Sequence, residues 1–439
     1  MKLHVITLGC QMSAADGTET AAALCRRGWQ ATAELEQADA ILLTTCSVRR
    51  HAEQRALSLI GRLREWKAQD PSRFLAVAGC VAERLGERLT RRFPHVDLVV
   101  GSKKAASYAD IVSEAMGNRL ESLRAAQEKD AVARPQPEPV PADAAAAPSV
   151  GNPVQTLTIM RGCSCSCTYC IVPSVRGRES CRPADEIIHE ARTRFQDGAR
   201  ELILLGQRVN AYRSADGMDF PDLLRALDAL PGLRRLRFMS PHPALCDDRL
   251  AAAVRECRTA CEWIHLPVQS GCDRILGMMR RGYTREQFLA TAARLRATIP
   301  GVVISTDIIV GFPSETEADF AQTLTLLDEL RPATVFCFKF SAREGTPAAM
   351  LTDDAPPSLK EQRLAAANAV VERLTRQALD SQVGSIVEVL AETPTFGRTR
   401  TGFKARWKSP VAAGDLVSMH VDAATRRTLL GDIDEPHNP

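Results

Sequence analysis

The sequence predicts an α/β protein with a small all-β segment at its carboxyl end. Two long segments alternate apolar runs typical of strands with helical patterns, and a third segment is rich in strand patterns separated by glycine turns. Alternation of strands with helices favours parallel sheets, because a helix carries the chain back to begin the next parallel strand. Within the 439 residues we expect four parts: 1–118, a linker at 119–150, 151–377 and 378–436.

The first part is expected to form a doubly wound parallel sheet. Strands are expected at Leu3–Leu8, Ala40–Leu43, Phe74–Ala78 and Val96–Val100, with helices at Thr18–Arg27, Ala52–Lys67 and Ala105–Met116. Three of these strands lead into Cys10, Cys46 and Cys80. Because parallel strands bring their carboxyl ends to one edge, the three thiols can converge there as ligands of an iron–sulfur cluster with an open iron. The alternative is that they are small buried residues at strand ends.

The linker at 119–150 is rich in proline and alanine. It carries Pro135, Pro137, Pro139, Pro141 and Pro148, with few large apolar residues. Dense proline favours an extended, semi-rigid tether. We therefore expect no catalytic residue within it.

The central part carries a second set of cysteines. Strands are expected at Gln155–Met160, Glu201–Leu205, Arg234–Met239, Trp263–Pro267, Val302–Val310 and Thr334–Phe340. Directly after the first strand, Cys163, Cys167 and Cys170 follow Cys-x3-Cys-x2-Cys spacing. Three thiolates leave one iron of a cluster open to a small molecule. A structural zinc site with Cys165 as the fourth ligand is the alternative.

At these cysteines the chain resembles the radical S-adenosylmethionine enzymes. The resemblance implies a partial (β/α)6 barrel, a [4Fe-4S] cluster at Cys163, Cys167 and Cys170, and methionine bound at the open iron, where one electron releases a 5′-deoxyadenosyl radical. Polar or glycine residues near the strand ends suit S-adenosylmethionine, which needs hydrogen-bond partners and close backbone approach. The expected cofactor-binding residues are Gly206, Gln207, Ser240, Gln269, Ser270 and Asp307. His242, between two prolines, stays outside the expected catalytic set.

The final part combines basic and aromatic residues. Strands are expected at Ile386–Leu390, Thr399–Trp407 and Leu416–Val421. Basic groups neutralise phosphates and aromatic faces stack bases, so RNA binding is expected at Arg398, Arg400, Lys404, Arg406 and Lys408, beside Phe396, Phe403 and Trp407. The alternative is a solvated basic strand on a barrel with an aromatic core. The pattern resembles a TRAM domain, an RNA-binding module.

Both cysteine sets together resemble the methylthiotransferases. The similarity rests on Gly9-Cys10-Gln11-Met12, Thr45-Cys46-Ser47-Val48, Gly79-Cys80-Val81-Ala82, Arg176-Gly177-Arg178-Glu179, Gly206-Gln207-Arg208-Val209-Asn210, Ser240-Pro241-His242-Pro243 and His265-Leu266-Pro267-Val268-Gln269-Ser270-Gly271. Gln11-Met12 and the residues around Asn210 are most similar to the tRNA branch, which converts N6-isopentenyladenosine at position 37 to its 2-methylthio form. Ser13, Thr44, Ser166 and Arg208 depart from the usual pattern of that branch.

The resemblance implies a division of labour between two [4Fe-4S] clusters. One S-adenosylmethionine methylates a sulfur at the cluster of Cys10, Cys46 and Cys80, and a second supplies the radical at the other cluster. Expected partners are tRNA, a flavodoxin- or ferredoxin-type electron donor and an iron–sulfur carrier protein. Alternatives are the same chemistry on threonylcarbamoyladenosine tRNA or a ribosomal-protein aspartate, or a non-catalytic metal-containing RNA-binding protein.

Composition sets the remaining limits. The 14 cysteines without a signal-peptide layout favour metal ligation and free thiols over a disulfide framework. No apolar run approaches the roughly 18 residues that span a membrane, so a cytoplasmic enzyme without membrane contact is expected. The net charge of +3 does not by itself indicate a nucleic-acid partner. Cys165 and Cys181 flank the central motif and are expected to be thiols open to oxidation rather than ligands.

Overall fold

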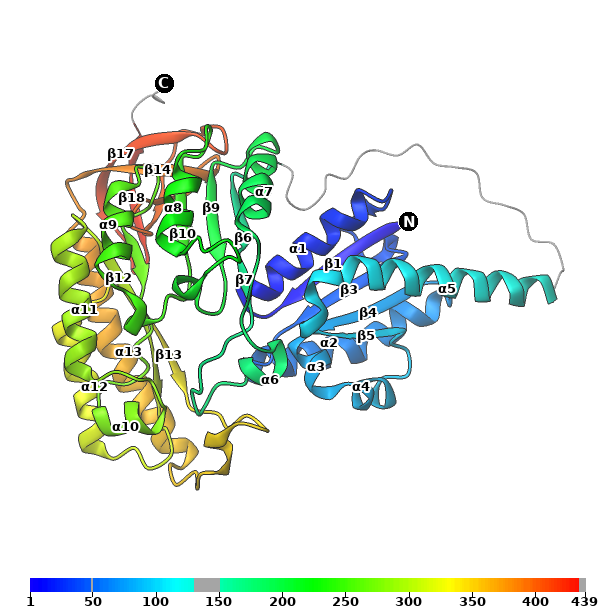
Figure 1. Ribbon diagram of the computed structural model, residues 1–439, viewed down its shortest axis with the longest axis horizontal. Coiled ribbons are helices and arrows are strands. Elements are labelled where there is room, and N and C mark those ends of the chain that lie inside the picture. Colours follow the sequence, from blue (N-terminus) through cyan, green and yellow to red (C-terminus); the bar gives the residue numbers. More distant parts are fainter. Residues whose placement is uncertain (49, 130–150, 434–439) are drawn as a thin grey trace. The chain divides into compact units, whose positions relative to one another are not determined.

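The computed structural model describes residues 1–48, 50–129 and 151–433 (Figure 1). They fall into two compact units. Unit 1 comprises Met1–Val150 with Ile171–Gly177, and unit 2 comprises Gly151–Cys170 with Arg178–Pro439. The short segment Ile171–Gly177 therefore packs with the amino-terminal part, although the sequence assigned it to the central part. The expected linker prolines lie outside the described residues.

Unit 1 is built on a five-stranded parallel sheet in the order β2-β1-β3-β4-β5 (Figure 1). Its strands are β1 (Lys2–Leu8), β2 (Gln30–Ala31), β3 (Ala40–Thr45), β4 (Phe74–Gly79) and β5 (Leu98–Gly101). Its helices are α1 (Gln11–Cys25), α2 (Arg50–Gln69), α3 (Cys80–Leu85), α4 (Glu87–Arg92), α5 (Tyr108–Lys129) and α6 (Val172–Arg176). The central strands β3 and β4 are buried along their whole length, as expected for strands covered on both faces.

Helices cover both faces of this sheet. On one face Leu24 of α1 and Val112 of α5 pack with Leu42 of β3. On the other face Leu63 of α2 and Val81 of α3 form a second core. The doubly wound sheet predicted from the sequence is confirmed. The short strand β2 and the helix α4 carried too little periodicity to be predicted, and α5 continues to Lys129, into the expected linker.

The central part of unit 2 has six parallel strands in two groups of three. The groups are β6 (Val154–Thr158), β9 (Glu201–Leu205) and β10 (Arg235–Phe238), and β11 (Trp263–His265), β12 (Val303–Val310) and β13 (Thr334–Lys339). A parallel bridge between Leu236 and Ala260 joins the groups. The helices are α7 (Ala184–Gln196), α8 (Phe220–Asp228), α9 (Asp248–Glu256), α10 (Asp273–Met278), α11 (Arg285–Thr298), α12 (Glu317–Leu330) and α13 (Pro357–Asp380). The partial (β/α)6 barrel is thus confirmed.

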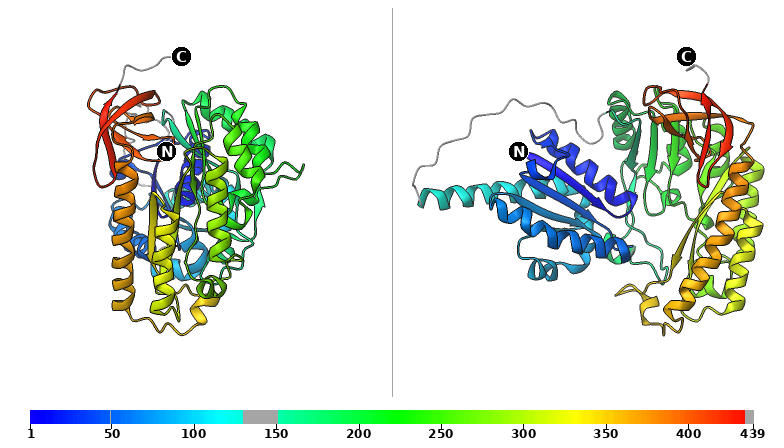
Figure 2. Two further views of the ribbon diagram at one scale, coloured as in Figure 1. Left: turned by 90° about the vertical axis from the view of Figure 1, so that its left-hand side faces the viewer. Right: turned by 180° about the vertical axis from the view of Figure 1, so that it is seen from behind.

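The chain after α13 forms a closed five-stranded barrel in the order β14-β15-β16-β18-β17 (Figure 2). The strands are β14 (Ile386–Thr393), β15 (Phe396–Thr399), β16 (Lys404–Arg406), β17 (Leu416–Ala424) and β18 (Thr428–Ile433). The single strand expected at Thr399–Trp407 is wrong, because the chain turns at Gly402, with a φ of 86°. This turn separates β15 from β16.

Buried arginines join the small barrel to the strand starts of the partial barrel. Arg235 is fully buried and donates to the carbonyl oxygens of Glu388 and Arg398. Arg237 donates to the carbonyl oxygens of Thr399 and Arg400 and pairs with Glu201 at 2.8 Å. The β-barrel therefore packs against the amino-terminal ends of β9 and β10. The carboxyl ends of the strands are left for the site.

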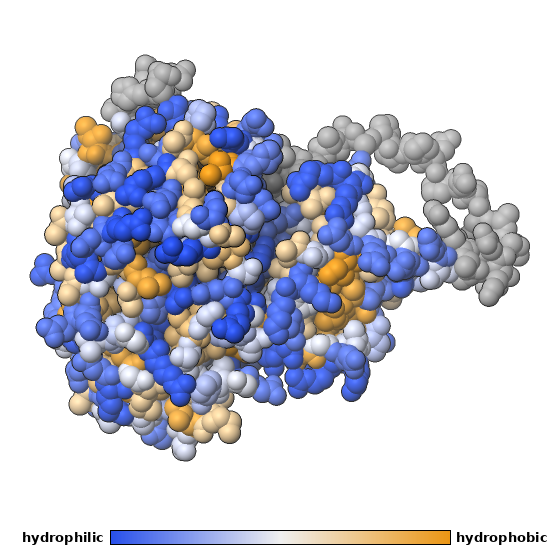
Figure 3. All heavy atoms as spheres, in the orientation of Figure 1, coloured by the Kyte–Doolittle hydropathy of each residue, from blue (hydrophilic) through white to orange (hydrophobic). Residues whose placement is uncertain are grey.

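On the face drawn in Figure 3, hydrophilic side chains cover most of the surface between scattered hydrophobic ones. Within residues 1–48, 50–129 and 151–433, no helix is long and apolar enough to cross a bilayer.

Candidate active site

The three amino-terminal cysteines gather at the carboxyl edge of the unit 1 sheet. Cys10 precedes α1, Cys46 follows β3 and Cys80 begins α3 after β4. The Cys10 and Cys46 thiols interact directly, and Cys80 lies close enough to affect the charge on Cys46. The structure thus brings Cys10 and Cys46 together with Cys80 nearby, and their shared role as cluster ligands stays a prediction.

Local geometry explains how this convergence is reached. The Cys10 amide donates to the Ser13 hydroxyl at 3.2 Å, and the Cys10 Sγ lies 3.3 Å from the same oxygen. A Cβ on Gly9 would lie 2.3 Å from the Cys46 Cβ, so glycine alone allows these two segments to approach. Ser13, a departure from the usual pattern of the branch, thus supports the start of α1.

The paired thiols differ in acidity. A hydrogen bond from the Cys46 thiol lowers the pKa of Cys10 to about 5, and the same bond raises the pKa of Cys46. The pair therefore holds one proton between two sulfurs at neutral pH. A thiolate is the form that binds iron, so Cys10 is ready to ligate.

The central cysteines lie in the loop that follows β7 (Met160–Arg161). Thr168, inside the motif, fixes this loop by three bonds. Its amide donates to the Met279 carbonyl at 3.1 Å and its hydroxyl donates to the Met278 carbonyl at 2.8 Å, while its carbonyl accepts from the Ala348 amide at 2.8 Å. The loop conformation is therefore fixed by backbone groups that follow α10 and by the segment after β13.

Arg281 is a site residue that sequence analysis missed. It is buried, and its Nη1 lies 3.3 Å from the Cys167 Sγ while its Nη2 donates to the Pro267 carbonyl at 3.0 Å. The Cys165 thiol and burial raise the pKa of Cys167, and the Arg281 guanidinium opposes that rise. Arg281 follows α10 by a few residues in a run of two arginines, and no spacing relative to the cysteines marks it.

The extra thiol of the motif lies between two expected ligands. Cys165 interacts with both the Cys163 and the Cys167 thiols. Its Sγ also lies 3.2 Å from Nη1 of Arg208, whose Nη2 donates to Glu179 at 2.9 Å. Cys165 lies inside the motif, Arg208 departs from the pattern of the tRNA branch, and the structure brings the two into contact.

Four of the six expected cofactor-binding residues, namely Gly206, Gln207, Ser240 and Gln269, lie within four residues of the end of a strand. Gly206 follows β9 so closely packed that a Cβ there would lie 2.5 Å from the Met160 Cγ. Ser240 follows β10 with a φ of 60°, and Gln269 follows β11 with a φ of 77°. Left-handed backbone at non-glycine residues is rare and concentrates at ligand sites.

The other two expected residues, Ser270 and Asp307, contact other protein groups. The Ser270 hydroxyl is fully buried, 3.4 Å from the Thr323 hydroxyl, and accepts from the Cys272 amide. Asp307 lies in the middle of β12 rather than at its end, 3.4 Å from His265 Nε2. The strand continues to Val310, so Asp307 lies three residues before its carboxyl end.

Two buried polar atoms among the described residues have no hydrogen-bond partner near these strand ends. They are Gln207 Oε1 and His242 Nδ1. Asn210 fixes the His242 backbone, accepting from its amide at 2.7 Å and donating to its carbonyl at 2.9 Å. Burial and the charges of Arg281 and Arg208 lower the pKa of His242 to about 4, so the ring is neutral at pH 7. Both orphaned atoms fit a polar ligand such as S-adenosylmethionine.

The thiol sets fit iron–sulfur clusters better than single metal ions. In the part of the chain that the structure describes, no three His, Cys, Asp or Glu side chains converge as ligands of one ion. A cluster needs a different arrangement, because each thiolate binds its own iron. Three thiols at one sheet edge and three in one fixed loop meet that requirement.

The basic residues of the carboxyl-terminal barrel do not share one environment. Lys404, Arg406 and Lys408 are exposed. Arg398 pairs with Glu392 at 2.7 Å and is 42% exposed. Arg400 instead holds Glu262 with two bonds of 2.8 and 2.9 Å and donates to the Ala260 carbonyl at 2.6 Å, so its guanidinium is committed within unit 2.

The aromatic residues expected beside them are largely in the barrel core. Phe403 is 8% and Trp407 3% exposed, and the Trp407 indole donates to the Pro394 carbonyl at 3.0 Å. Only Phe396 is partly exposed. For Phe403 and Trp407 the alternative reading, an aromatic barrel core, holds.

The fold and the two sets of three cysteines define a radical S-adenosylmethionine enzyme with an additional amino-terminal cysteine site. The Radical SAM superfamily matches residues 157–327, and the family described as "Uncharacterized protein family UPF0004" matches residues 2–101. The chain belongs to the family of tRNA-2-methylthio-N(6)-dimethylallyladenosine synthases. It is 40% identical to the protein of that name from Syntrophobacter fumaroxidans, over 98% of this chain and 95% of the relative. It is 37% identical to that of Pseudomonas fluorescens, over 98% and 99%.

A solved structure gives the same fold at much lower identity. The radical S-adenosylmethionine methyltransferase TsrM from Kitasatospora setae, with a tryptophan substrate and an analogue of S-adenosylmethionine bound, aligns with a TM-score of 0.57 at 12% identity. The alignment covers 85% of this chain and 89% of that one. This similarity concerns the fold alone.

Proposed function

We propose that this protein inserts a methylthio group at C2 of N6-isopentenyladenosine in tRNA by radical S-adenosylmethionine chemistry. The observation that supports the proposal is that this chain aligns over 98% of its length with a synthase named for this product, and that it carries one set of three cysteines after the strands of unit 1 and another in the loop after β7. The isopentenyl group is the same as the dimethylallyl group of the relatives' name.

The target carbon explains why a radical enzyme is required. The C2 hydrogen of adenine is bound to an aromatic carbon and is not acidic, so none of the bases in the site can remove it as a proton. When bound, a [4Fe-4S] cluster and S-adenosylmethionine supply a carbon radical able to take that hydrogen. Cys163, Cys167 and Cys170 hold this cluster, and Thr168 and Arg281 fix their loop.

The strand ends of unit 2 bind the cosubstrate. Gln207 and His242 offer acceptors that are buried and unpartnered among the described residues, and Gly206 lets the backbone approach. Neutral His242 can accept a hydrogen bond but carries no charge that would repel the sulfonium. Ser240 and Gln269 present backbone groups from their strained conformations. Asp307 and Ser270 support the strands around the site.

The unit 1 cysteines hold the second cluster. When bound there, a cluster held by Cys10, Cys46 and Cys80 would supply the sulfur that becomes the methylthio group, with two S-adenosylmethionine molecules used per turnover. A flavodoxin- or ferredoxin-type protein supplies electrons, an iron–sulfur carrier supplies clusters, and a tRNA substrate implies action in the cytoplasm.

Nucleoside mass spectrometry tests this proposal. Anaerobically reconstituted protein should hold about eight irons and convert isopentenyladenosine in tRNA to its 2-methylthio form. The Cys163→Ala, Cys167→Ala, Cys170→Ala variant should keep half the iron and lose S-adenosylmethionine cleavage. The Cys10→Ala, Cys46→Ala, Cys80→Ala variant should keep cleavage and lose methylthiolation. Product only on threonylcarbamoyladenosine tRNA or on a ribosomal protein would contradict the substrate, and equal loss of cleavage in both variants would contradict the division of labour.

A further inference from the structure

A buried arginine beside the unit 1 cysteines has a donor with nothing to bind. Arg176, at the end of α6, pairs through Nη2 with Asp16 of α1 at 2.8 Å, and the two side chains are 3% and 1% exposed. Its Nη1 is buried without a hydrogen-bond partner among the described residues. A buried guanidinium that leaves a donor unpaired is unfavourable unless another acceptor belongs in the site.

The position of Arg176 identifies that acceptor. Its charge interacts with Cys80 and Cys10 as well as with Asp16. Cys80 packs in one buried cluster with Ile171 and Val175, which lie just before and within α6. The Ser102 hydroxyl donates to the Val175 carbonyl at 2.5 Å and fixes the helix further. The free side of the guanidinium therefore lies beside the expected cluster ligands.

Tyr108, on α5, is a second buried residue near these cysteines with a donor that lacks an acceptor. Its side chain is 1% exposed at the start of α5, and its hydroxyl neighbours the Gly79 amide, Asp16, Arg176 and Cys80. The Gly79 amide approaches that hydroxyl as a donor, and among the described residues no acceptor is found for the hydroxyl proton. Ser47, next to Cys46 in the chain, also has a fully buried hydroxyl for which the described part of the chain offers no partner. Donors without an acceptor thus lie near these cysteines, and an electron-rich group bound at the thiols would satisfy them.

We propose that Arg176 and Tyr108 donate hydrogen bonds to the sulfur atoms of the cluster held by Cys10, Cys46 and Cys80, with Asp16 fixing the guanidinium. This inference rests on the proposed function only in assuming a cluster at these cysteines. Hydrogen bonds and positive charge at cluster sulfur stabilise the reduced state and so raise the reduction potential. They also favour anionic sulfur at the open iron. Arg176 and Tyr108 are therefore positioning residues for the sulfur to be transferred.

The alternative role is structural. Through Asp16, Arg176 also anchors α6 to unit 1, and loss of this anchor alone would lower activity. The two roles differ in what they do to the potential of an intact cluster. Tyr108→Phe removes a hydroxyl and keeps the ring in the core, so it changes the cluster's hydrogen bonding with little effect on packing.

The experiment uses the full chain with Cys163, Cys167 and Cys170 changed to Ala, so that the remaining iron reports the unit 1 cluster. In this background Tyr108→Phe and Arg176→Lys are compared by iron content and by the midpoint potential from titration monitored by electron paramagnetic resonance. Both variants should keep about four irons per chain and shift the potential to more negative values, with a larger shift in the double variant. Matched controls are Lys67→Met, which breaks the partly buried pair with Asp97 elsewhere in unit 1, and Tyr212→Phe, which removes a hydroxyl bonded to the Arg182 carbonyl. Both controls should leave the potential unchanged.

An unchanged potential in Tyr108→Phe and Arg176→Lys, with iron retained, would overturn the inference. If Arg176→Lys loses its iron and Tyr108→Phe keeps it, the midpoint potential of Tyr108→Phe tests the inference: a more negative value supports it and an unchanged value overturns it. No iron in the background protein would overturn both this inference and the cluster assignment. The titration contains no tRNA, so a wrong substrate in the proposed function would leave its result intact.

Discussion

At the scale of single residues, the extra cysteine of the central motif is the sharpest test of ligand assignment. Cys165 contacts the thiols of Cys163 and Cys167, yet a fourth ligand would occupy the iron that the cosubstrate needs. Cys165→Ala should therefore keep the iron content and the rate of 5′-deoxyadenosine formation near those of the unchanged protein. Iron analysis and chromatography of the nucleoside measure both.

Cys181→Ala is the matched control for this variant. The Cys181 Sγ accepts a hydrogen bond from the Arg213 amide at 3.5 Å, and Arg213 is not one of the expected cluster ligands. Loss of the cluster in Cys165→Ala, but not in Cys181→Ala, would restore the four-ligand reading.

Gly79 gives a second prediction at this scale. Its φ is 102°, and a Cβ there would lie 2.3 Å from the Thr45 carbonyl oxygen. Gly79→Ala should lower the free energy of unfolding by more than the ~1–3 kcal/mol of backbone strain alone and should displace Cys80, reducing the iron held by unit 1. Urea unfolding and iron analysis check this.

Gly28→Ala separates strain from contact. Gly28 also has a positive φ, of 88°, but nothing lies within 4 Å of the added Cβ. This variant should lose only the strain energy and keep its iron. Equal effects of the two substitutions would show that the close approach to Thr45 is not what requires glycine.

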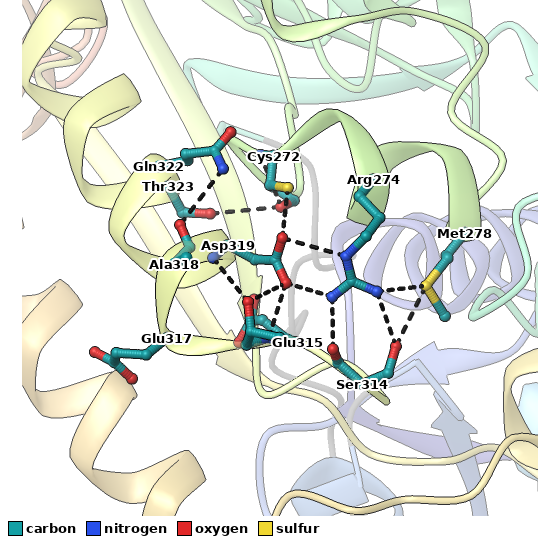
Figure 4. A network of polar contacts seen from close by, with 12 residues as sticks. Cys272, Arg274, Met278, Ser314, Glu315, Glu317, Ala318, Asp319, Gln322 and Thr323 are labelled. Carbon is teal, nitrogen blue, oxygen red and sulfur yellow. Dashed lines mark hydrogen bonds and ion pairs between the residues drawn. The ribbon is translucent and has the colours of Figure 1, made fainter.

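At the scale of elements, α12 begins in a network centred on one buried carboxylate (Figure 4). Asp319 pairs with Arg274, accepts from the Cys272 thiol at 2.9 Å and accepts from the Thr316 hydroxyl at 2.6 Å. The bond from Arg274, then those from Cys272 and Thr316, hold the pKa of Asp319 well below its usual range. The network joins α10 to α12.

The lowered pKa predicts an acid-dependent stability. The unfolded carboxyl titrates near pH ~4, so the contribution of Asp319 is fully present above that pH and is lost as the pH falls toward its lower folded pKa. Asp319→Asn should lower the free energy of unfolding by about 1–3 kcal/mol at pH 7 and by less at pH 3. Urea unfolding followed by tryptophan fluorescence at both pH values measures the difference.

Asp328→Asn, on the same helix, provides the comparison. Asp328 pairs with Arg373, and both side chains are about half exposed. Its substitution should change stability by at most about 1 kcal/mol with little pH dependence. If the free energy of unfolding of Asp319→Asn changed with pH in parallel with that of the unchanged protein, the network around Asp319 would not be the source of the acid dependence.

The elements also show what a sequence can predict. All six strands of the partial barrel and four of five in the unit 1 sheet were predicted to within a few residues, because their apolar runs are long and bounded by helices. The strand ends then place the cysteines. The sequence could not predict Arg281 or the surroundings of Arg176, because these contacts join residues more than 100 positions apart. It also could not separate Arg400 from its neighbours, since the partner Glu262 comes from another element.

At the scale of the whole molecule, the basic residues of the carboxyl-terminal barrel lie in two different environments. Arg400 ties the barrel to Glu262, whereas Lys404, Arg406 and Lys408 lie exposed along and just after β16. Exposed cations in a row are suited to contact with tRNA phosphates, and we predict that these three make such contacts.

Changing Lys404, Arg406 and Lys408 together to Gln should weaken tRNA binding and reduce the slope of log affinity against log salt by up to about three, because each lost phosphate contact removes counterion release. S-adenosylmethionine cleavage without tRNA should stay unchanged. Methylthiolation should fall at limiting tRNA and recover at high tRNA. Arg400→Gln should instead destabilise the barrel and leave the salt slope nearly unaltered. Filter binding across a salt series measures these slopes. If the triple variant binds tRNA like the unchanged protein while Arg400→Gln alters the slope, the prediction is wrong and Arg400, rather than the three exposed residues, contacts the RNA.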